Sequence, residues 1–145
     1  MTRSLLVMTC LSLLSCTKPP TPAGLALSAF LEQIARGNHT TVAGELASGS
    51  RLTDKFTGEL ADGTVEVIPR FNIGVHDWSK TKLIKEEVLP TGDHRIEMLL
   101  DVCLRAEDQA RCTRPNVYAF TAIVTNDEGT WKVASSSCSE KDIIR

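Results

Sequence analysis

The triplet His76-Asp77-Trp78 places an imidazole, a carboxylate and an aromatic ring side by side, which makes it the most suggestive stretch for chemistry. An imidazole in contact with a carboxylate is a common acid–base pair. On a β-strand, however, His76 and Trp78 would share one face and Asp77 would lie on the other, so the pair could meet only in a loop. We favour a surface loop from which Trp78 packs into the core, and this interpretation assigns the triplet no catalysis.

Two cysteines suggest a disulfide bond. Cys103 and Cys112 flank residues 104–111, which predict the end of one strand, a tight turn near 107–108 and the start of the next strand. With a two-residue turn the cysteines face each other across the hairpin, and at a non-hydrogen-bonded position they are close enough to bond. A slip of one residue would put the thiols on opposite faces. We predict the Cys103–Cys112 bridge, together with a bulge at 113–116 that restores the apolar face of the following strand.

The other cysteines and histidines give weaker signals. No cysteine pair has the C-x2-C spacing of a zinc site, so we expect no metal. Cys138 has no neighbouring base and is interpreted as a buried or idle thiol, or as half of a different bridge. His39 and His94 occupy ordinary capping or surface positions at the starts of predicted elements. Because no G-x-S-x-G, phosphate-binding loop, H-E-x-x-H or dinucleotide fingerprint is present, we expect no cofactor and no enzyme.

The start of the chain predicts export and a lipid anchor. Arg3 precedes an apolar run over 5–14, which is long enough for a signal peptide and too short to span a bilayer. The run ends in Leu-Leu-Ser-Cys at 13–16, which resembles the lipobox of bacterial lipoproteins. This resemblance implies that the Cys16 thiol receives a diacylglycerol, that residues 1–15 are removed, and that the new N-terminus is acylated, for example with palmitate. Thr17 in place of Asp favours the periplasmic side of a Gram-negative outer membrane.

Downstream of Cys16 the sequence predicts a tether and one domain. The Pro-rich stretch over 16–24 is extended and semi-rigid, and residues 25–145 are enough for a single core. The formal net charge is −2, with both signs interspersed, so no basic stripe indicates nucleic acid. We therefore expect a membrane partner through the lipid and no nucleic-acid partner.

Helical patterns come first in the domain. Leu27, Phe30, Leu31 and Ile34 have the spacing of one helix face, and Gly37 follows as a terminating glycine. A second short helix is expected after Asn38, which can cap it. A third helical turn or two is predicted over 50–58, where Ser50 can cap it, Leu52 and Phe56 are its apolar residues and Gly58 ends it.

Strand patterns dominate the rest of the chain. A short candidate strand covers 65–68, and the clearest strand covers 94–105, in which apolar side chains occupy every second position. Residues 82–89 precede it across a turn at Gly92, which would align Ile84 and Val88 with the apolar face. A second hairpin is predicted from 117–125 and 130–136.

Helices followed by antiparallel strands indicate a single α+β domain, with the N-terminal helices packed on one face of a curved antiparallel sheet. The helix at 29–34, the short helix after it and a last strand reading Gly-Thr-Trp-Lys-Val at 129–133 resemble the nuclear transport factor 2-like (ketosteroid isomerase-like) cone fold over residues 25–138. A cystatin-like helix on a sheet would explain much of the same pattern.

The resemblance also implies a possible pocket. Enzymes of the cone family use a carboxylate base and a hydrogen-bond donor inside a cone of apolar side chains. The residues that could line such a pocket here are Trp78, Asp101 and Tyr118, the only tyrosine. We favour the alternative in which Asp101 points to solvent and pairs with Arg95 or Arg105.

These features predict a non-catalytic cell-envelope lipoprotein that binds a protein partner, as an accessory module of an envelope assembly or as a periplasmic inhibitor. An exposed apolar patch on the outer face of the sheet would support this function. The alternative is a carrier or sensor of a small apolar ligand, which requires an open apolar pocket. An isomerase-like enzyme ranks third and requires a buried carboxylate with a raised pKa.

Overall fold

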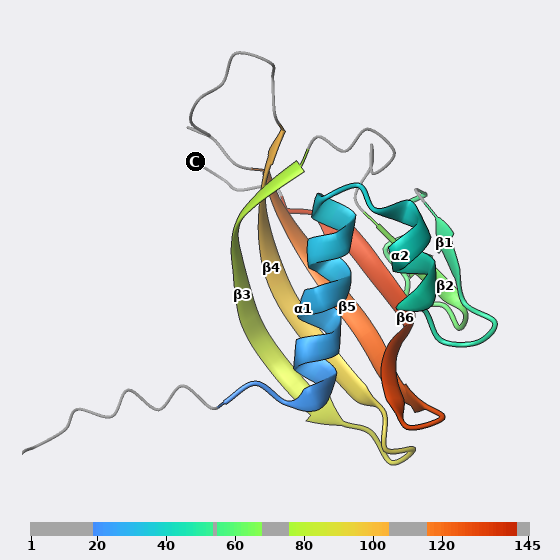
Figure 1. Ribbon diagram of the computed structural model, residues 1–145. Coiled ribbons are helices and arrows are strands. Elements are labelled where there is room, and N and C mark those ends of the chain that lie inside the picture. The colour runs from blue at the N-terminus through green and yellow to red at the C-terminus, as the bar shows by residue number, and fades with distance from the viewer. Residues whose placement is uncertain (1–18, 54, 68–75, 105–115, 142–145) are drawn as a thin grey trace, which may run out of the picture.

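The computed structural model describes residues 19–53, 55–67, 76–104 and 116–141, except for the side chains of 39–40, 76–80 and 102–104. These residues form an α+β domain with two helices and one mixed six-stranded sheet (Figure 1). The helices are α1 (Pro22–Ala35) and α2 (His39–Gly44). The strands are β1 (Arg51–Thr53), β2 (Thr64–Glu66), β3 (His76–Val88), β4 (His94–Leu104), β5 (Asn116–Asp127) and β6 (Thr130–Glu140).

Helix α1 begins where the sequence supplies a capping residue and a proline. The Thr21 hydroxyl accepts a hydrogen bond from the Gly24 N–H at 3.0 Å, and Pro22 occupies the first turn, where its missing N–H costs nothing. The chain leaves the helix at Gly37, whose φ of 72° is left-handed and suits glycine. The predicted first helix is therefore confirmed. Its buried side chains are Ala23, Leu27, Phe30, Leu31 and Ile34.

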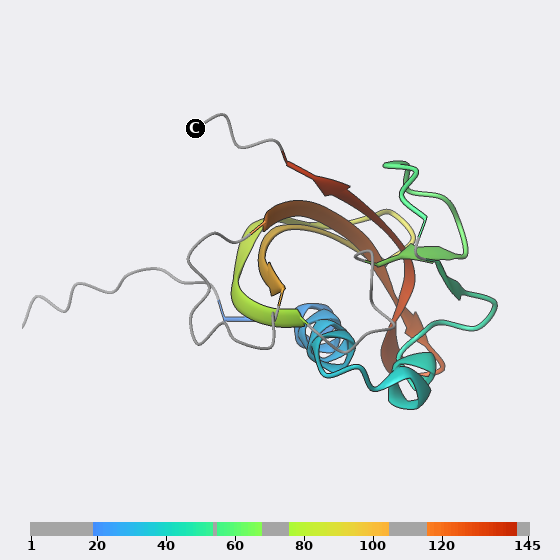
Figure 2. The same cartoon turned by 90° about the horizontal axis from the view of Figure 1, so that it is seen from above.

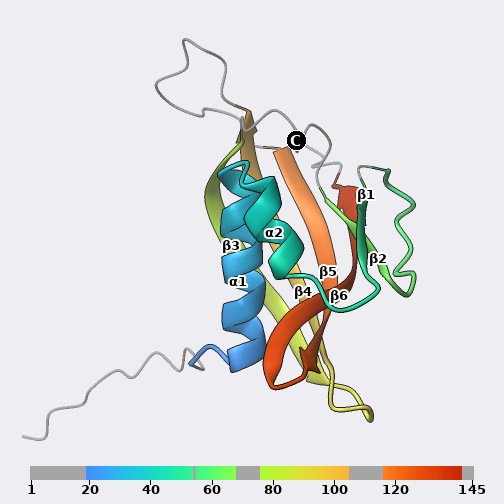
Figure 3. The same cartoon turned by 45° about the vertical axis from the view of Figure 1, so that its right-hand side comes forward.

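Helix α1 lies lengthwise against one face of the sheet, which we call the core face (Figures 1 and 2). The shorter α2 lies beside α1 (Figure 3). Between α1 and the sheet, Leu27 and Phe30 pack into the same cluster as Leu100 and Phe120, all at most 2% exposed. Burial of these apolar side chains is the main force that holds the two layers together. Neither described helix is long and apolar enough to cross a membrane.

The central strands follow the predicted period of two. In β4, the buried side chains Ile96, Met98 and Leu100 alternate with half-buried or exposed residues. Strand β5 pairs antiparallel with both β4 and β6. The turn between β5 and β6 contains Glu128 and Gly129 at φ of 52° and 88°, the conformation that two-residue hairpins prefer. The hairpins predicted from 82–89 with 94–105 and from 117–125 with 130–136 are confirmed, and β3, β5 and β6 are longer than expected.

The predicted helical turns around Leu52 are wrong. Residues 51–53 form β1, which pairs in parallel with β2 and places Leu52 opposite Val65. Strand β2 in turn pairs in parallel with β6. The sheet order is β1-β2-β6-β5-β4-β3, so the sheet is mixed and the expected all-antiparallel sheet is wrong. Local helix signals are weak for three residues, and strand pairing with a distant segment decides their conformation.

The predicted alignment of Ile84 with the apolar face is also wrong. The register between β3 and β4 shifts between Leu83 and Lys85, which leaves Ile84 without an aligned partner. Such a bulge turns the strand and displaces one residue from the regular alternation. Ile84 is consequently 51% exposed.

Candidate functional site

The strand register separates the predicted pocket residues. Tyr118 lies opposite Leu100, and Asp101 lies opposite Val117. Because side chains alternate along a strand, Tyr118 lies on the core face, where it is buried, and Asp101 lies on the outer face, where it is half-buried. The prediction that these two residues share a pocket is therefore wrong. Trp78 lies in β3 opposite Val102, and its side chain is outside the described part of the chain.

The backbone of the 76–78 triplet is a strand, so the expected surface loop is wrong. His76 pairs with Leu104, and Asp77 pairs with Cys103. Successive strand residues do not bring an imidazole and a carboxylate together. Cys16 and Cys112 lie outside the described residues, so the lipid anchor and the disulfide stay predictions.

Among the described residues, the most deeply buried carboxylate belongs to Glu66, at the end of β2. It is 0% exposed, yet its oxygens have several donors. The Thr57 N–H donates to Oε1 at 2.8 Å, the Thr57 hydroxyl donates to the same oxygen, and the Cys138 N–H donates to Oε2 at 3.1 Å. The Ser136 hydroxyl donates to the Glu66 carbonyl oxygen at 2.7 Å. We call Thr57, Glu66, Ser136 and Cys138 the Glu66 cluster; it joins β2, β6 and the segment before β2.

The Glu66 cluster favours an anionic carboxylate and a protonated thiol. Burial raises the pKa of the Glu66 carboxyl, but the hydrogen bonds from Thr57 and Cys138 outweigh it and hold the pKa below its ordinary value. Burial, reinforced by the negative charge of Glu66, raises the pKa of the Cys138 thiol to about 12. A thiol with this pKa is not a nucleophile at neutral pH. The structure thus agrees with an inert Cys138, which is a free, buried cysteine.

A second carboxylate network lies where α1 begins. The Thr21 hydroxyl, which caps α1, donates to Glu86 Oε1 on β3 at 2.5 Å. The same oxygen lies 2.7 Å from Nδ1 of His94, and the His94 ring packs edge-on against Trp131 with centroids 4.9 Å apart. The side chains of Glu86 and His94 are each 14% exposed. We call Thr21, Glu86, His94 and Trp131 the Glu86 network.

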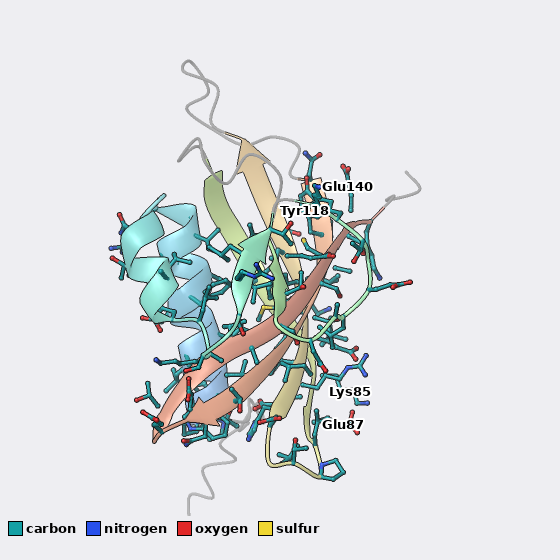
Figure 4. All side chains as sticks on the ribbon, turned by 90° about the vertical axis from the view of Figure 1, so that its right-hand side faces the viewer. Lys85, Glu87, Tyr118 and Glu140 are labelled. Carbon is teal, nitrogen blue, oxygen red and sulfur yellow. The ribbon has the colours of Figure 1, made fainter. Side chains whose placement is uncertain are left out.

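The two groups of residues lie toward opposite ends of the domain. Lys85 and Glu87 flank Glu86 and lie near one end, whereas Tyr118 and Glu140 lie at the other (Figure 4). Cys138 of the Glu66 cluster is two residues from Glu140 and pairs with Phe120. We call the end with Thr21, Glu86 and the turn at 89–93 the tether end, because the predicted tether leads to it.

Strand β3 is the outermost strand of the sheet on its side, and it carries unusual exposed side chains. Leu83, Ile84 and Val88 are 55%, 51% and 63% exposed. Large apolar residues on a sheet edge are uncommon because a free edge invites pairing with other chains. Among the described strand residues, the exposed large apolar side chains therefore lie on this edge strand, and the patch expected on the outer face of the sheet is not seen there.

The chemistry that the described residues offer is limited. The Glu66 carboxylate already accepts hydrogen bonds from Thr57 and Cys138. The Glu86 carboxylate already contacts the Thr21 hydroxyl and the His94 imidazole. Among the described residues, no group of three His, Cys, Asp or Glu side chains is arranged to hold a metal ion. Sequence reasoning missed Glu66, Glu86 and Thr21, and it treated His94 as a surface residue. The alternation of apolar and polar residues along a strand does not reveal these four residues, because their partners come from other segments of the chain.

The chain was compared with protein families, curated proteins and solved structures. No protein-family model matches it, and no curated protein or solved structure is significantly similar.

Proposed function

We propose that the chain is a non-catalytic lipoprotein of the cell envelope, anchored through Cys16 in the outer membrane, whose domain binds a protein partner in the periplasm. On the resemblance given above, we further propose that α1 and the sheet belong to the cone-like fold. The observation that carries the proposal is the edge strand β3, where Leu83 and Ile84 are more than half exposed.

An exposed edge strand can accept an extended segment of another protein as an additional strand. The backbone N–H and C=O groups supply affinity, and pockets for alternate side chains supply specificity. Lys82 and Lys85 flank the apolar pair, and lysines on an edge discourage indiscriminate pairing. This combination favours one selective protein partner over general aggregation.

The other two candidate functions have less support. A carrier needs open space between α1 and the sheet, whereas the described side chains there pack into one buried cluster. An isomerase-like enzyme needs a carboxyl with a raised pKa, and the buried Glu66 carboxyl has a lowered one.

Photo-crosslinking in the native cells tests the partner. A photoreactive amino acid at Lys85, an exposed position beside the apolar pair, should give a defined protein adduct. The adduct should disappear in a Leu83→Ser/Ile84→Ser variant, because the apolar contacts are lost. The matched control carries the probe at Glu59, an exposed position away from β3. An adduct that persists in the double variant, or that forms equally at Glu59, would contradict docking on β3.

The anchor has its own test. Cys16→Ala removes the thiol that the diacylglycerol modifies, so we expect an uncleaved precursor and loss of the lipid. Mass spectrometry of the mature wild-type chain should show an acylated Cys16 at the N-terminus. Unchanged processing and unchanged membrane partition of Cys16→Ala would refute the anchor.

A further inference from the structure

The tether end of the domain is unusually apolar for a surface. Leu25, in the first turns of α1, is 56% exposed, and Val88, at the end of β3, is 63% exposed. They are the two most exposed large apolar side chains in the described part of the chain. Prolines are also exposed at the start of α1 and in the turn after β3, at positions 19, 20, 22 and 90.

A hydrogen bond joins the two elements that carry Leu25 and Val88. The Thr21 hydroxyl donates to Glu86 at 2.5 Å and so joins the start of α1 to the end of β3. Leu25 lies one helical turn beyond Thr21, since its N–H donates to the Thr21 carbonyl oxygen at 2.9 Å. Val88 lies two residues beyond Glu86, on the same face of the strand. The two apolar side chains therefore belong to one rigid end of the domain.

The length of the tether determines what can cover this end. Thr21 is the fifth residue after Cys16, so an extended chain between them spans at most about 18 Å. Once Cys16 is acylated, the tether end cannot move farther than this from the bilayer. A protein partner would have to fit into that gap, whereas the lipid surface is always there.

The charges at the tether end also suit a lipid surface. Lys85 and Glu87 pair with each other at 3.1 Å. Within the turn at 89–93 only Asp93 is charged, and its carboxylate accepts a hydrogen bond from the Thr91 hydroxyl at 2.9 Å. Contact with the bilayer therefore desolvates few charges and gains no attraction from anionic lipids. Apolar contact alone is weak for a protein free in solution, but tethering makes it intramolecular and raises its effective concentration.

We infer that the tether end rests on the phospholipid surface, with Leu25 and Val88 in the boundary between headgroups and acyl chains. This inference rests on the proposed anchor at Cys16. The orientation directs α1 and β3 away from the membrane and leaves Leu83 and Ile84, about 13 to 16 Å from Val88 along β3, accessible to a partner.

Energy transfer in vesicles tests the orientation. Full-length acylated protein is placed in vesicles of phosphatidylethanolamine and phosphatidylglycerol with a fluorescent acceptor lipid. A donor dye is introduced at the exposed Thr91 through an unnatural amino acid. Leu25→Ser/Val88→Ser should reduce the ratio of docked to free orientations about 100-fold and lower the energy transfer. Leu83→Ser/Ile84→Ser, a matched loss of exposed apolar side chains, should leave the transfer unchanged.

The outcomes separate this inference from the anchor. Equal transfer in the wild type and in Leu25→Ser/Val88→Ser, with all proteins still floating with the vesicles, would overturn the orientation and leave the anchor intact. Equal flotation of Cys16→Ala and wild type would overturn the anchor, and the orientation with it. A wild-type signal that requires phosphatidylglycerol would also count against the inference, because it would indicate electrostatic binding.

Discussion

The carboxylates of Glu66 and Glu86 differ in the kind of donor that each one meets. Glu66 receives backbone N–H groups and a hydroxyl from two other segments, none of which titrates in the ordinary range. Glu86 shares one oxygen between the hydroxyl of Thr21 and the ring of His94. The Glu66 carboxylate is held by donors that keep its pKa low, whereas the Glu86 carboxylate can form an ion pair with a protonated imidazole.

This difference shows that burial alone does not make a carboxylate catalytic. The donors around Glu66 compensate for its desolvation and lower its pKa, which is the opposite of what a general acid requires. Glu86 joins the helix cap to β3 and thereby positions the end of the domain nearest the predicted anchor. Both carboxylates therefore connect segments that are distant in the sequence.

The largest expected effect is from removal of the Glu66 carboxylate. Glu66→Ala leaves the donors of Thr57 and Cys138 without their acceptor in a buried site, so we expect a loss of about 3 kcal/mol in the free energy of unfolding. Chemical denaturation measures it. Glu59→Ala, an exposed glutamate of the same connecting segment, should change the stability by less than about 0.5 kcal/mol. A loss below about 1 kcal/mol in Glu66→Ala would show that the cluster is dispensable.

Removal of the Thr21 hydroxyl should have a smaller effect. Thr21→Ala loses the helix cap, worth about 1 kcal/mol, and the hydrogen bond to Glu86, worth about 1 kcal/mol more. Thr21→Ser retains both interactions and should remain close to wild type. Ser28→Ala, an exposed position of α1, controls for helix propensity. Equal stability of Thr21→Ala and Thr21→Ser would remove the energetic basis of the Glu86 network.

The smallest expected effect is on how the free energy of unfolding depends on pH in the acid range. The folded-state pKa of Glu66 lies below its unfolded value, so its contribution is complete above the unfolded pKa and is lost as pH falls through the folded pKa. Wild type should therefore lose stability more steeply than Glu66→Gln as the pH falls from about 5 to below 4. Denaturation curves across this range measure the two slopes. Parallel slopes would mean that Glu66 titrates alike in the folded and unfolded chains.

Much of the fold could be predicted from local patterns. The apolar positions of α1 and the period of two in β4 each identify a face without knowledge of any other segment. The turn at Glu128 and Gly129 was also recognisable, because it needs left-handed backbone that few residues adopt. Leu52 was assigned wrongly because its conformation depends on pairing with Val65 in β2, and the residues next to Leu52 in the sequence do not show this pairing. Ile84 was assigned wrongly because a bulge shifts the alternation.

The candidate sites were less predictable than the fold. In the sequence, Glu66 cannot be distinguished from any other polar residue of a short strand. Only the fold brings the N–H groups of Thr57 and Cys138 to its carboxylate. His94 looks like a surface residue until β6 brings Trp131 against its ring. Asp101 and Tyr118, which the resemblance suggested as a pair, lie on opposite faces because of the register between β4 and β5.

The sequence by itself determined the features that depend on neighbouring residues: the predicted export signal and lipobox, the capped helix, the central strands and their buried face. Only the tertiary structure decided the order of the strands, the parallel pairing of β1 and β2, the burial of Glu66 and the link from Thr21 to Glu86. The physical reason is that helix and strand periodicity are local properties of the chain. A buried carboxylate, in contrast, acquires its pKa and its role from donors that folding brings to it.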